Sequence, residues 1–411
     1  MMTDVRESTA TQAGVRNRRV GHWLMLVAVS VMLVILGIKL AVYSFLKSVP
    51  DDFFARQAPD LRPAIPDSVV MQALEPVPGY LWQTLPADAP APLENPTTAA
   101  KIALGEKLFF DKNLSLDRTL ACASCHELYS YAGTDGAPVS TGINGQKGNR
   151  NAPTVWNAAF QKRLFWDGRV ASLEQQAIKP FLNPIEMGML SPVQIVERVK
   201  EQAAYQPDFA AAFADEPDIT IANIVRAIAS YERSLITNDS PYDDYVRGDS
   251  AALTEQQLSG MVLFEKTGCV HCHFGPNFSA ASIYNSGLPF RVFPANPDPI
   301  TQQYGLNTES DGPTVWRVPS LRNVALTGPW FHNGAVDDLH DVVRIMARTQ
   351  LARSQKRSFQ WSAKKLGIIE NPDLTDQQVE DIVAFLKALS SRRLTSAERQ
   401  HLTTRSGGSE R

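Results

Sequence analysis

The most distinctive chemistry in this sequence lies in two cysteine pairs, each followed at once by a histidine. Residues 122–126 read Cys-Ala-Ser-Cys-His, and residues 269–273 read Cys-Val-His-Cys-His. Both fit Cys-x-x-Cys-His, the motif that attaches a c-type haem. Two thiols a short turn apart can form thioethers with the two vinyl groups of one haem, and the adjacent histidine then lies beneath the iron as proximal ligand. The predicted haem-binding residues are Cys122, Cys125 and His126 at the first site, and Cys269, Cys272 and His273 at the second.

A Cys-x-x-Cys pair also fits a zinc site or a dithiol redox pair. The histidine after each pair, together with the export segment described below, favours haem over both. The chain has four cysteines, so two covalently attached haems use all of them and leave none for a disulfide.

The elements that must position these motifs are mainly helical. Residues 97–126 and 254–273 share one plan, in which a threonine able to cap a helix precedes a helix with a Leu-Phe pair near its end, and the chain then turns into the haem motif. No set of alternating strands is visible. We therefore expect a mainly α protein with two cytochrome c-like haem domains. Further helical periodicity covers residues 192–203, 219–235, 339–349 and 375–389.

Composition excludes other classes of protein. Of the 411 residues, 44% are hydrophobic and 20% charged, which is typical of a folded chain rather than a disordered one. Forty basic residues against 43 acidic ones give a net charge of -3. Binding to nucleic-acid phosphates calls for a basic excess, so no nucleic-acid partner is expected.

Residues 23–46 predict a single transmembrane helix. The 24-residue run has one charge, Lys39, and a helix of it at about 1.5 Å per residue would span the ~30 Å hydrocarbon core. Arginines precede the run, and Asp51 and Asp52 follow it, so the positive-inside rule places the N-terminus in the cytoplasm. The alternative is a cleaved signal peptide, but the run exceeds the usual apolar length and no small-x-small site closes it. The prediction is a single-pass protein of the inner (cytoplasmic) membrane.

The remaining chain divides by composition and by the repeat. Ten prolines between Pro50 and Pro96 indicate an extended tether, or a strap laid over the domain. The C-terminal end is polar and rich in glycine and serine. The predicted organisation is a cytoplasmic N-terminus (1–22), an anchor (23–46), a Pro-rich tether (47–94), a first haem domain (95–250), a second haem domain (251–390) and a polar tail (391–411).

Beyond the two haem motifs, five further motifs resemble the bacterial di-haem cytochrome c peroxidases, whose close relatives are the di-haem enzymes that mature methylamine dehydrogenase. The resemblance covers about residues 95–390. It implies a periplasmic, mostly helical protein with a peroxidatic first domain, a second domain through which electrons enter, and a calcium ion bound at the interface. The motifs are Asn151-Ala-Pro-Thr154, Phe165-Trp-Asp-Gly-Arg169, Asn183-Pro-Ile-Glu-Met187, Val318-Pro-Ser-Leu-Arg-Asn-Val324 and Phe331-His-Asn-Gly334.

By this resemblance, Glu186 falls on the family's catalytic glutamate. Cleavage of peroxide requires a proton to move from one oxygen to the other, which a carboxylate within hydrogen-bond reach can carry, a role typically worth about 10²- to 10⁴-fold. Without the motif, Glu186 would be an acidic residue ahead of a helix that begins near Ser191. Gln176 matches a second distal-pocket residue that could hydrogen-bond peroxide, and its alternative is a surface glutamine.

The resemblance also assigns residues to electron transfer. Trp166 matches the tryptophan between the two haems, although a lone aromatic residue is by default part of a core. Met346 lies 14 residues after His332, as the family's axial methionine does, and His/Met ligation raises the potential of a haem. The alternative is a core-packing methionine on helix 339–349. His332 itself is expected beside the second haem as a hydrogen-bonding residue.

Calcium would fall on Asn151, Thr327 and Pro329, the last two through backbone carbonyls, with water completing the oxygen shell. Asn151 could instead be a turn residue before Pro153.

One departure from the family pattern concerns the loop after the first haem motif. Many members carry a histidine there that ligates the first haem at rest, whereas this sequence has Ile143 and no histidine between His126 and His271. We therefore expect a first haem that is five-coordinate or water-bound at rest and needs no reductive activation. Other residues that could swing in as a ligand are Met187, Met189, Tyr129 and Tyr131.

Three functions are open at this point. The first is a peroxidase that reduces hydrogen peroxide to water with electrons from a small donor protein, a cytochrome c or copper protein, or from a membrane quinol pathway. The second is a protein-modifying oxidase of the methylamine-dehydrogenase-maturation type, whose members place tyrosine where Met346 stands. The third is a membrane-tethered electron-transfer cytochrome or redox sensor, which would require both irons to be fully ligated by protein and would leave Glu186 and Gln176 without a purpose. The soluble relatives are commonly dimers, and a tether would permit a homodimer.

Overall fold

The computed structural model describes residues 80–285, 288–294, 298–306, 315–351 and 374–396, together with a few positions between residues 30 and 40. By its contacts the chain separates into residues 1–60 and residues 61–411, and every element below belongs to the second unit. Apart from those few positions, the predicted anchor lies outside the described residues, as does the end of the tail from residue 397. Among the helices that the structure does describe, none combines the length and apolar character of a membrane span.

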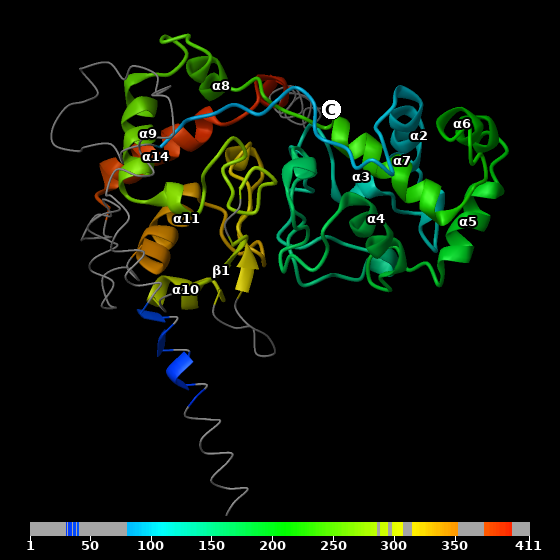
Figure 1. The fold of residues 1–411 in the computed structure, drawn as a ribbon, viewed down its shortest axis with the longest axis horizontal. Helices are drawn as coiled ribbons and strands as arrows, with labels where there is room; N and C mark the ends of the chain where they lie inside the picture. Colours follow the sequence, from blue (N-terminus) through cyan, green and yellow to red (C-terminus); the bar gives the residue numbers. More distant parts are fainter. Residues whose placement is uncertain are drawn as a thin grey trace, which may run out of the picture. The chain divides into compact units, whose positions relative to one another are not determined.

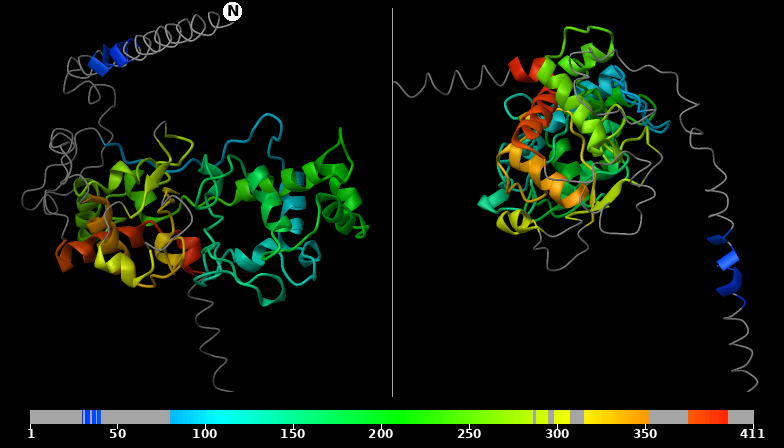
Figure 2. Two further views of the ribbon diagram at one scale, coloured as in Figure 1. Left: turned by 90° about the horizontal axis from the view of Figure 1, so that it is seen from below. Right: turned by 90° about the vertical axis from the view of Figure 1, so that its left-hand side faces the viewer.

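The elements between residues 99 and 234 form one helical group (Figures 1 and 2). Its core is built from buried aliphatic and aromatic side chains of α2, α4, α5, α6 and α7. The elements are α2 (Ala99–Phe110), η2 (Lys112–Leu114), α3 (Cys122–Cys125), η3 (Ile143–Gly145), η4 (Ala158–Phe160), α4 (Leu173–Leu182), α5 (Pro192–Lys200), α6 (Tyr205–Ala212) and α7 (Ile221–Ser234).

A second group has its own core, centred on α9, α11 and α14. Its two short strands pair antiparallel, with Arg291 opposite Trp316. The elements are α8 (Pro241–Val246), α9 (Glu255–Lys266), η5 (Cys269–His271), β1 (Phe290–Val292), α10 (Pro299–Gln303), β2 (Val315–Arg317), η6 (Val324–Leu326), α11 (Leu339–Met346), the π-helical turn η7 (Ala347–Leu351) and α14 (Asp376–Ala388).

The two groups repeat one helix pair. α2 packs on α7 in the first group, and α9 packs on α14 in the second. A Cβ on Gly105 would lie 2.0 Å from the Ala227 carbonyl oxygen, and one on Gly260 would lie 1.8 Å from that of Asp381, so each pair approaches closely only because a glycine stands at the crossing. The mainly helical fold expected from the sequence is confirmed.

The expected helix boundaries hold within about three residues. Thr254 caps α9 as expected, whereas α2 is capped by Thr98, whose side chain accepts the Lys101 N–H, rather than by Thr97. The helix expected over 339–349 is α only to Met346 and continues as the π-helical turn. The sequence did not predict α4, which carries a proline inside it, nor the short helices α6, α8 and α10.

Residues 80–95 form a strap without helix or strand that runs from the second group to the first (Figure 1). Trp82 is buried in the second core, against the Tyr242 and Phe385 rings. Asn95, at the other end, donates to Glu174 Oε1 (2.9 Å) in the first group. The described part of the segment predicted as a tether is therefore packed onto the haem domains.

The first residues of the segment predicted as a polar tail pack against the body of the protein. Residues 392–396 are helical, and Leu394 is fully buried in the core of the first group. Ser391 donates its N–H to Asn323 Oδ1 (2.9 Å). The packed part of the chain extends past residue 390 because Leu394 is buried, which a single leucine in a polar segment does not predict.

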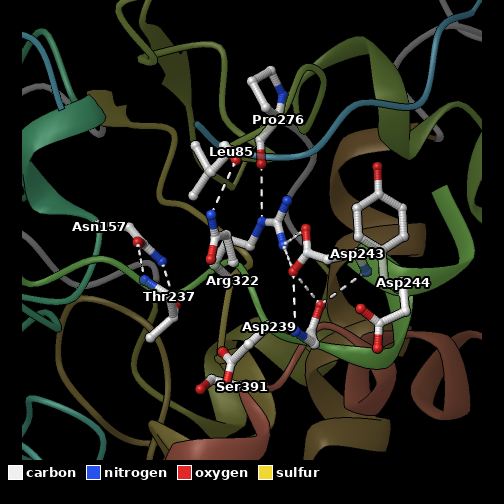
Figure 3. Close-up of polar contacts among 12 residues, drawn as sticks. Leu85, Asn157, Thr237, Asp239, Asp243, Asp244, Pro276, Arg322 and Ser391 are labelled. Atoms are coloured by element: carbon white, nitrogen blue, oxygen red, sulfur yellow. Dashed lines mark hydrogen bonds and ion pairs between the residues drawn. The ribbon is translucent and has the colours of Figure 1, made fainter. Parts of the chain in front are cut away.

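A buried ion pair braces the second group (Figure 3). Asp243, at the start of α8, accepts two hydrogen bonds from Arg322 Nη1, at 2.8 and 2.7 Å, and both side chains are at most 2% exposed. Arg322 Nε donates to the Pro276 carbonyl oxygen (2.9 Å). Beside the pair, Asn157 of the first group exchanges hydrogen bonds with Thr237. Thr237 Oγ1 also accepts a hydrogen bond from Asn323 Nδ2 of the second group (3.0 Å), so buried polar contacts link the two groups.

Removal of the Asp243 carboxylate leaves the Arg322 charge buried and unpaired. We expect Asp243→Ala to lower the free energy of unfolding by about 3–5 kcal/mol in chemical denaturation. The matched control is Asp244→Ala, one residue on, because Asp244 pairs with Arg247 and Arg392 at the surface and should cost no more than about 1 kcal/mol. Equal losses for the two variants would contradict the role of the buried pair.

Candidate haem sites

One cavity of about 780 Å³ reaches both haem motifs. Its lining contains the two cysteines and the histidine of each motif, so the two predicted sites open into one continuous space. None of the four cysteines forms a disulfide. The remaining predicted site residues line the same cavity: Glu186, Gln176, Trp166, Met346, Asn151, Thr327 and Pro329.

Each proximal histidine is oriented by one hydrogen bond from Nδ1. His126 Nδ1 lies 3.1 Å from the Gly133 carbonyl oxygen, and His273 Nδ1 lies 3.0 Å from that of Phe278. Because a carbonyl only accepts, Nδ1 carries the proton and Nε2 keeps a lone pair for a metal. Burial lowers the pKa of both imidazoles, that of His273 to about 4, so both are neutral at pH 7. Two thiols and one neutral imidazole fit a c-type haem at each site.

The loop that supplies the Gly133 carbonyl is folded by Glu127, which sequence reasoning missed. The Glu127 carboxylate accepts the backbone N–H groups of residues 129–131. Its backbone N–H donates to the Thr134 carbonyl (2.9 Å), and its carbonyl accepts from Gly133 (2.7 Å). The only indication in the sequence was an acidic residue directly after a haem-motif histidine.

Glu186 lies in the turn after α4 and faces the cavity. Asn183 Nδ2 donates to its Oε1 at 2.7 Å. Burial raises the pKa of the Glu186 carboxyl, while the Arg169 charge and the Asn183 hydrogen bond act in the opposite direction. A carboxyl held in one position with a raised pKa is suited to accept a proton from one substrate oxygen and return it to another.

The loop after the first haem motif is tied to this turn. The Ile143 N–H donates to the Glu186 carbonyl oxygen (2.9 Å), and the Ile143 side chain is 3% exposed. A Cβ on Gly142 would lie 1.8 Å from the Ile185 carbonyl oxygen, so the two segments touch backbone to backbone. Ile143 therefore packs beneath the turn and supports Glu186.

Of the four alternative ligands for the first haem, Met187 lines the cavity. Met189, Tyr129 and Tyr131 are not among the described lining residues. Met187 and Met189 are both buried in the core of the first group. Tyr129 is 47% exposed, with its ring 6.3 Å from that of Trp156.

Trp166 stands where the two groups meet. Its Nε1 donates to the Asn151 carbonyl oxygen (2.8 Å), and its ring meets His332 edge-on with centroids 6.5 Å apart. The Asn151 N–H donates to the His332 carbonyl oxygen (2.8 Å). The two motifs NAPT and FHNG, far apart in the sequence, thus hold Trp166 in the wall of the cavity from both sides.

Three further cavity residues were not predicted as functional: Trp316, Arg150 and Glu232. The His332 ring stacks on Trp316 with centroids 4.4 Å apart, and Arg150 lies over the same indole at 5.0 Å. Burial and the Arg150 charge lower the pKa of His332 to about 4. Glu232 of α7 is buried, which raises its pKa to about 8, and among the described residues its Oε2 has no hydrogen-bond partner. A single glutamate within an amphipathic helix gives no such indication in the sequence.

Met346 is the last residue of α11 and lines the cavity. It also packs against a small cluster that includes Phe293, Trp316 and Ile345. Its thioether could serve with His273 to hold a second haem, and the His/Met pair is a ligand set of cytochromes c.

The calcium ligands predicted by resemblance would supply neutral oxygens. Asn151 Nδ2 donates to the Ala137 and Pro138 carbonyls at 3.0 and 3.3 Å, which leaves its Oδ1 as the oxygen able to bind a cation. Among the described residues, no cluster of three or more His, Cys, Asp or Glu could hold a metal ion.

The helical fold and the cavity define a c-type cytochrome with two haem motifs, and the half-buried carboxyl of Glu186 lies in the cavity wall. A family profile described as "Di-haem cytochrome c peroxidase" matches residues 99–251. Cytochrome c551 peroxidase of Pseudomonas aeruginosa is 37% identical over 322 residues, which are 76% of this chain and 85% of that protein. The chain belongs to the di-haem cytochrome c peroxidase family, which confirms the resemblance seen in the sequence.

Two further proteins are similar. Cytochrome c peroxidase Ccp of Escherichia coli (strain K12) is 38% identical over 303 residues, which are 73% of this chain but only 60% of that longer protein. The crystal structure of a MauG-like protein associated with microbial copper homeostasis matches with a TM-score of 0.61 and 33% identity, over 76% of this chain and 95% of that one. The relatives thus include both peroxidases and a MauG-like protein.

Met346 provides a test of the second site. We expect Met346→His and Met346→Gln to lower the reduction potential of the second haem by at least ~100 mV, within the ~0.8 V that axial ligands span. Spectroelectrochemical titration measures both haems in one sample, so the potential of the first haem is the internal control. An unchanged second potential would mean that another residue is the ligand.

Proposed function

We propose that this protein reduces hydrogen peroxide to water, with two electrons that enter at the second haem site and pass Trp166 to the first. Two protons and two electrons convert one hydrogen peroxide into two waters. When bound, the two haems supply the redox-active irons that exchange electrons with donor and peroxide. The single observation that carries this proposal is Glu186, a half-buried carboxyl with a raised pKa in the wall of the first haem site.

Glu186 would accept the proton of peroxide at the oxygen nearer the metal and deliver it to the departing oxygen. The Asn183 amide fixes Oε1, which leaves the other carboxylate oxygen to exchange the proton. Gln176 of α4 lines the same space and would hold the substrate by a hydrogen bond from its amide.

Met346 favours this function over a protein-modifying oxidase. The relatives of the maturation type were expected to place tyrosine where this chain has methionine, and a tyrosine at that position could not provide the thioether of a high-potential haem. A second haem with His/Met ligation suits the uptake of electrons from a donor protein.

The proposal also includes a calcium ion, an electron donor and a membrane anchor. Calcium would bind between the groups at Asn151, Thr327 and Pro329, and elemental analysis of the purified protein would detect it. The donor would be a small cytochrome c or copper protein, or a membrane quinol pathway. Residues 23–46 would anchor a homodimer or monomer to the inner membrane with its haem domains in the periplasm, and partition of the full-length chain into washed membranes would test the anchor.

Glu186→Gln tests the proton transfer. The amide keeps the size of the side chain but cannot accept a proton, so peroxide turnover should fall by at least ~100-fold. Both haems should remain attached, as judged by the pyridine haemochrome spectrum. Near-normal turnover with both haems present would remove Glu186 from the mechanism.

The pH dependence has a defined sign. Because burial raises the pKa of the Glu186 carboxyl, the group is protonated below that raised pKa and can no longer accept a proton. The kcat/KM for peroxide should therefore fall as the pH decreases through it. The residual activity of Glu186→Gln should lack this limb, and an identical acid limb in the variant would assign it to another group.

A further inference from the structure

The first and second helical groups are related by more than the α2–α7 and α9–α14 helix pairs. A second sequence repeat makes α4 equivalent to α11. Positions 166 residues apart are identical at Pro153 and Pro319, Asn157 and Asn323, Phe165 and Phe331, Gly168 and Gly334, Val170 and Val336, and Leu173 and Leu339. No insertion interrupts this register between residues 153 and 173. Four of the five family motifs quoted above overlap this repeat, and the fifth, at residues 183–187, lies beyond it.

The backbone follows the same register. Asn157 and Asn323 have φ values of 61° and 60°, and each precedes a short 3-10 helix, η4 or η6. Phe165 and Phe331 both have φ of 66°, an unusual conformation for a phenylalanine. The isolated bridge between Leu164 and Val170 corresponds to the bridge between Trp330 and Val336.

The register continues into the helices that face the haem sites. α4 begins at Leu173 after the cap Ser172, and α11 begins at Leu339 after the cap Asp338. α4 packs on α7 as α11 packs on α14. The same four positions of each helix line the cavity: Leu173, Gln176, Ala177 and Pro180 in α4, and Leu339, Val342, Val343 and Met346 in α11.

Pro180 is therefore the counterpart of Met346. Both stand seven residues after the start of their helix and line the cavity, but proline has no side-chain donor atom. We propose that residue 180 is the sixth-ligand position of the first haem site, and that the presence of proline there leaves the position free for peroxide. This inference rests on the proposed ligation of the second haem by Met346.

Pro180 also supports the catalytic turn. Its carbonyl oxygen accepts the N–H of Met187 at 3.2 Å and that of Asn183 at 3.3 Å. Met187 and Asn183 lie on either side of Glu186. Pro180 therefore offers no side-chain ligand and also holds the turn that carries the Glu186 carboxyl. A substitution that retains the backbone carbonyl keeps the second function and isolates the first.

The experiment uses the ferric protein with both haems and no peroxide. Near-infrared magnetic circular dichroism identifies methionine-ligated ferric haem, and EPR reports high-spin haem. In the wild type we expect one methionine-ligated and one high-spin haem, and in Pro180→Met two methionine-ligated haems with loss of the high-spin signal and of peroxide turnover. Pro180→Ala should retain the wild-type spectra.

Three further variants complete the test. Gln176→Met puts the same side chain at the neighbouring cavity position and should leave the first haem high-spin. If Pro180→Met does not fold, Pro180→His carries the same test with an imidazole donor, and should give a low-spin first haem. Met346→Ala should remove the methionine signature of the wild type.

The inference is overturned if folded Pro180→Met or Pro180→His keeps a high-spin first haem, if Gln176→Met ligates equally well, or if Pro180→Ala becomes low-spin. A low-spin first haem in the wild type would overturn it as well. The proposed peroxidase mechanism fails separately, through normal turnover of Glu186→Gln, because the ligation spectra are recorded without substrate. Retention of the methionine signature in Met346→Ala would show that the second site was misassigned and would remove the basis of the comparison.

Discussion

Each haem site depends on one hydrogen bond from the Nδ1 of a buried imidazole to a backbone carbonyl oxygen. These bonds, at Gly133 and at Phe278, fix the tautomer and the plane of the ring, so that Nε2 presents its lone pair to the cavity. The two cysteines before each histidine lie on a short turn and line the same cavity.

Both sites share the oriented histidine, but they differ in the residues on the helix that lines each site. The second has a thioether at the end of α11, which suits a haem that only passes electrons. The first has proline at the equivalent place and Glu186 on the turn beyond it, held by Asn183 and by the loop that carries Ile143. In the proposed function, the duplicated helices would thus provide one site closed by Met346 and one site with room for peroxide and a proton carrier.

The sequence predicted what depends on local spacing and on family motifs. The haem motifs, the main helices and the mainly helical class followed from residues close together in the chain, and the structure brings every proposed site residue to one cavity. What it missed depends on distant partners. Asp243 meets Arg322 across 79 positions, Trp82 enters a core formed by residues far beyond it, and Leu394 fills a core begun by α2. Single apolar or charged residues in polar segments do not reveal such partners.

The central claim is that the first haem site is open at rest and that Glu186 works within it. The most direct test is a stopped-flow reaction of the fully oxidised protein with hydrogen peroxide, with EPR and optical spectra of both haems recorded before mixing. The account predicts a high-spin first haem that reacts within milliseconds, without prior reduction of the second. Two low-spin haems and no reaction until the second haem is reduced would contradict it.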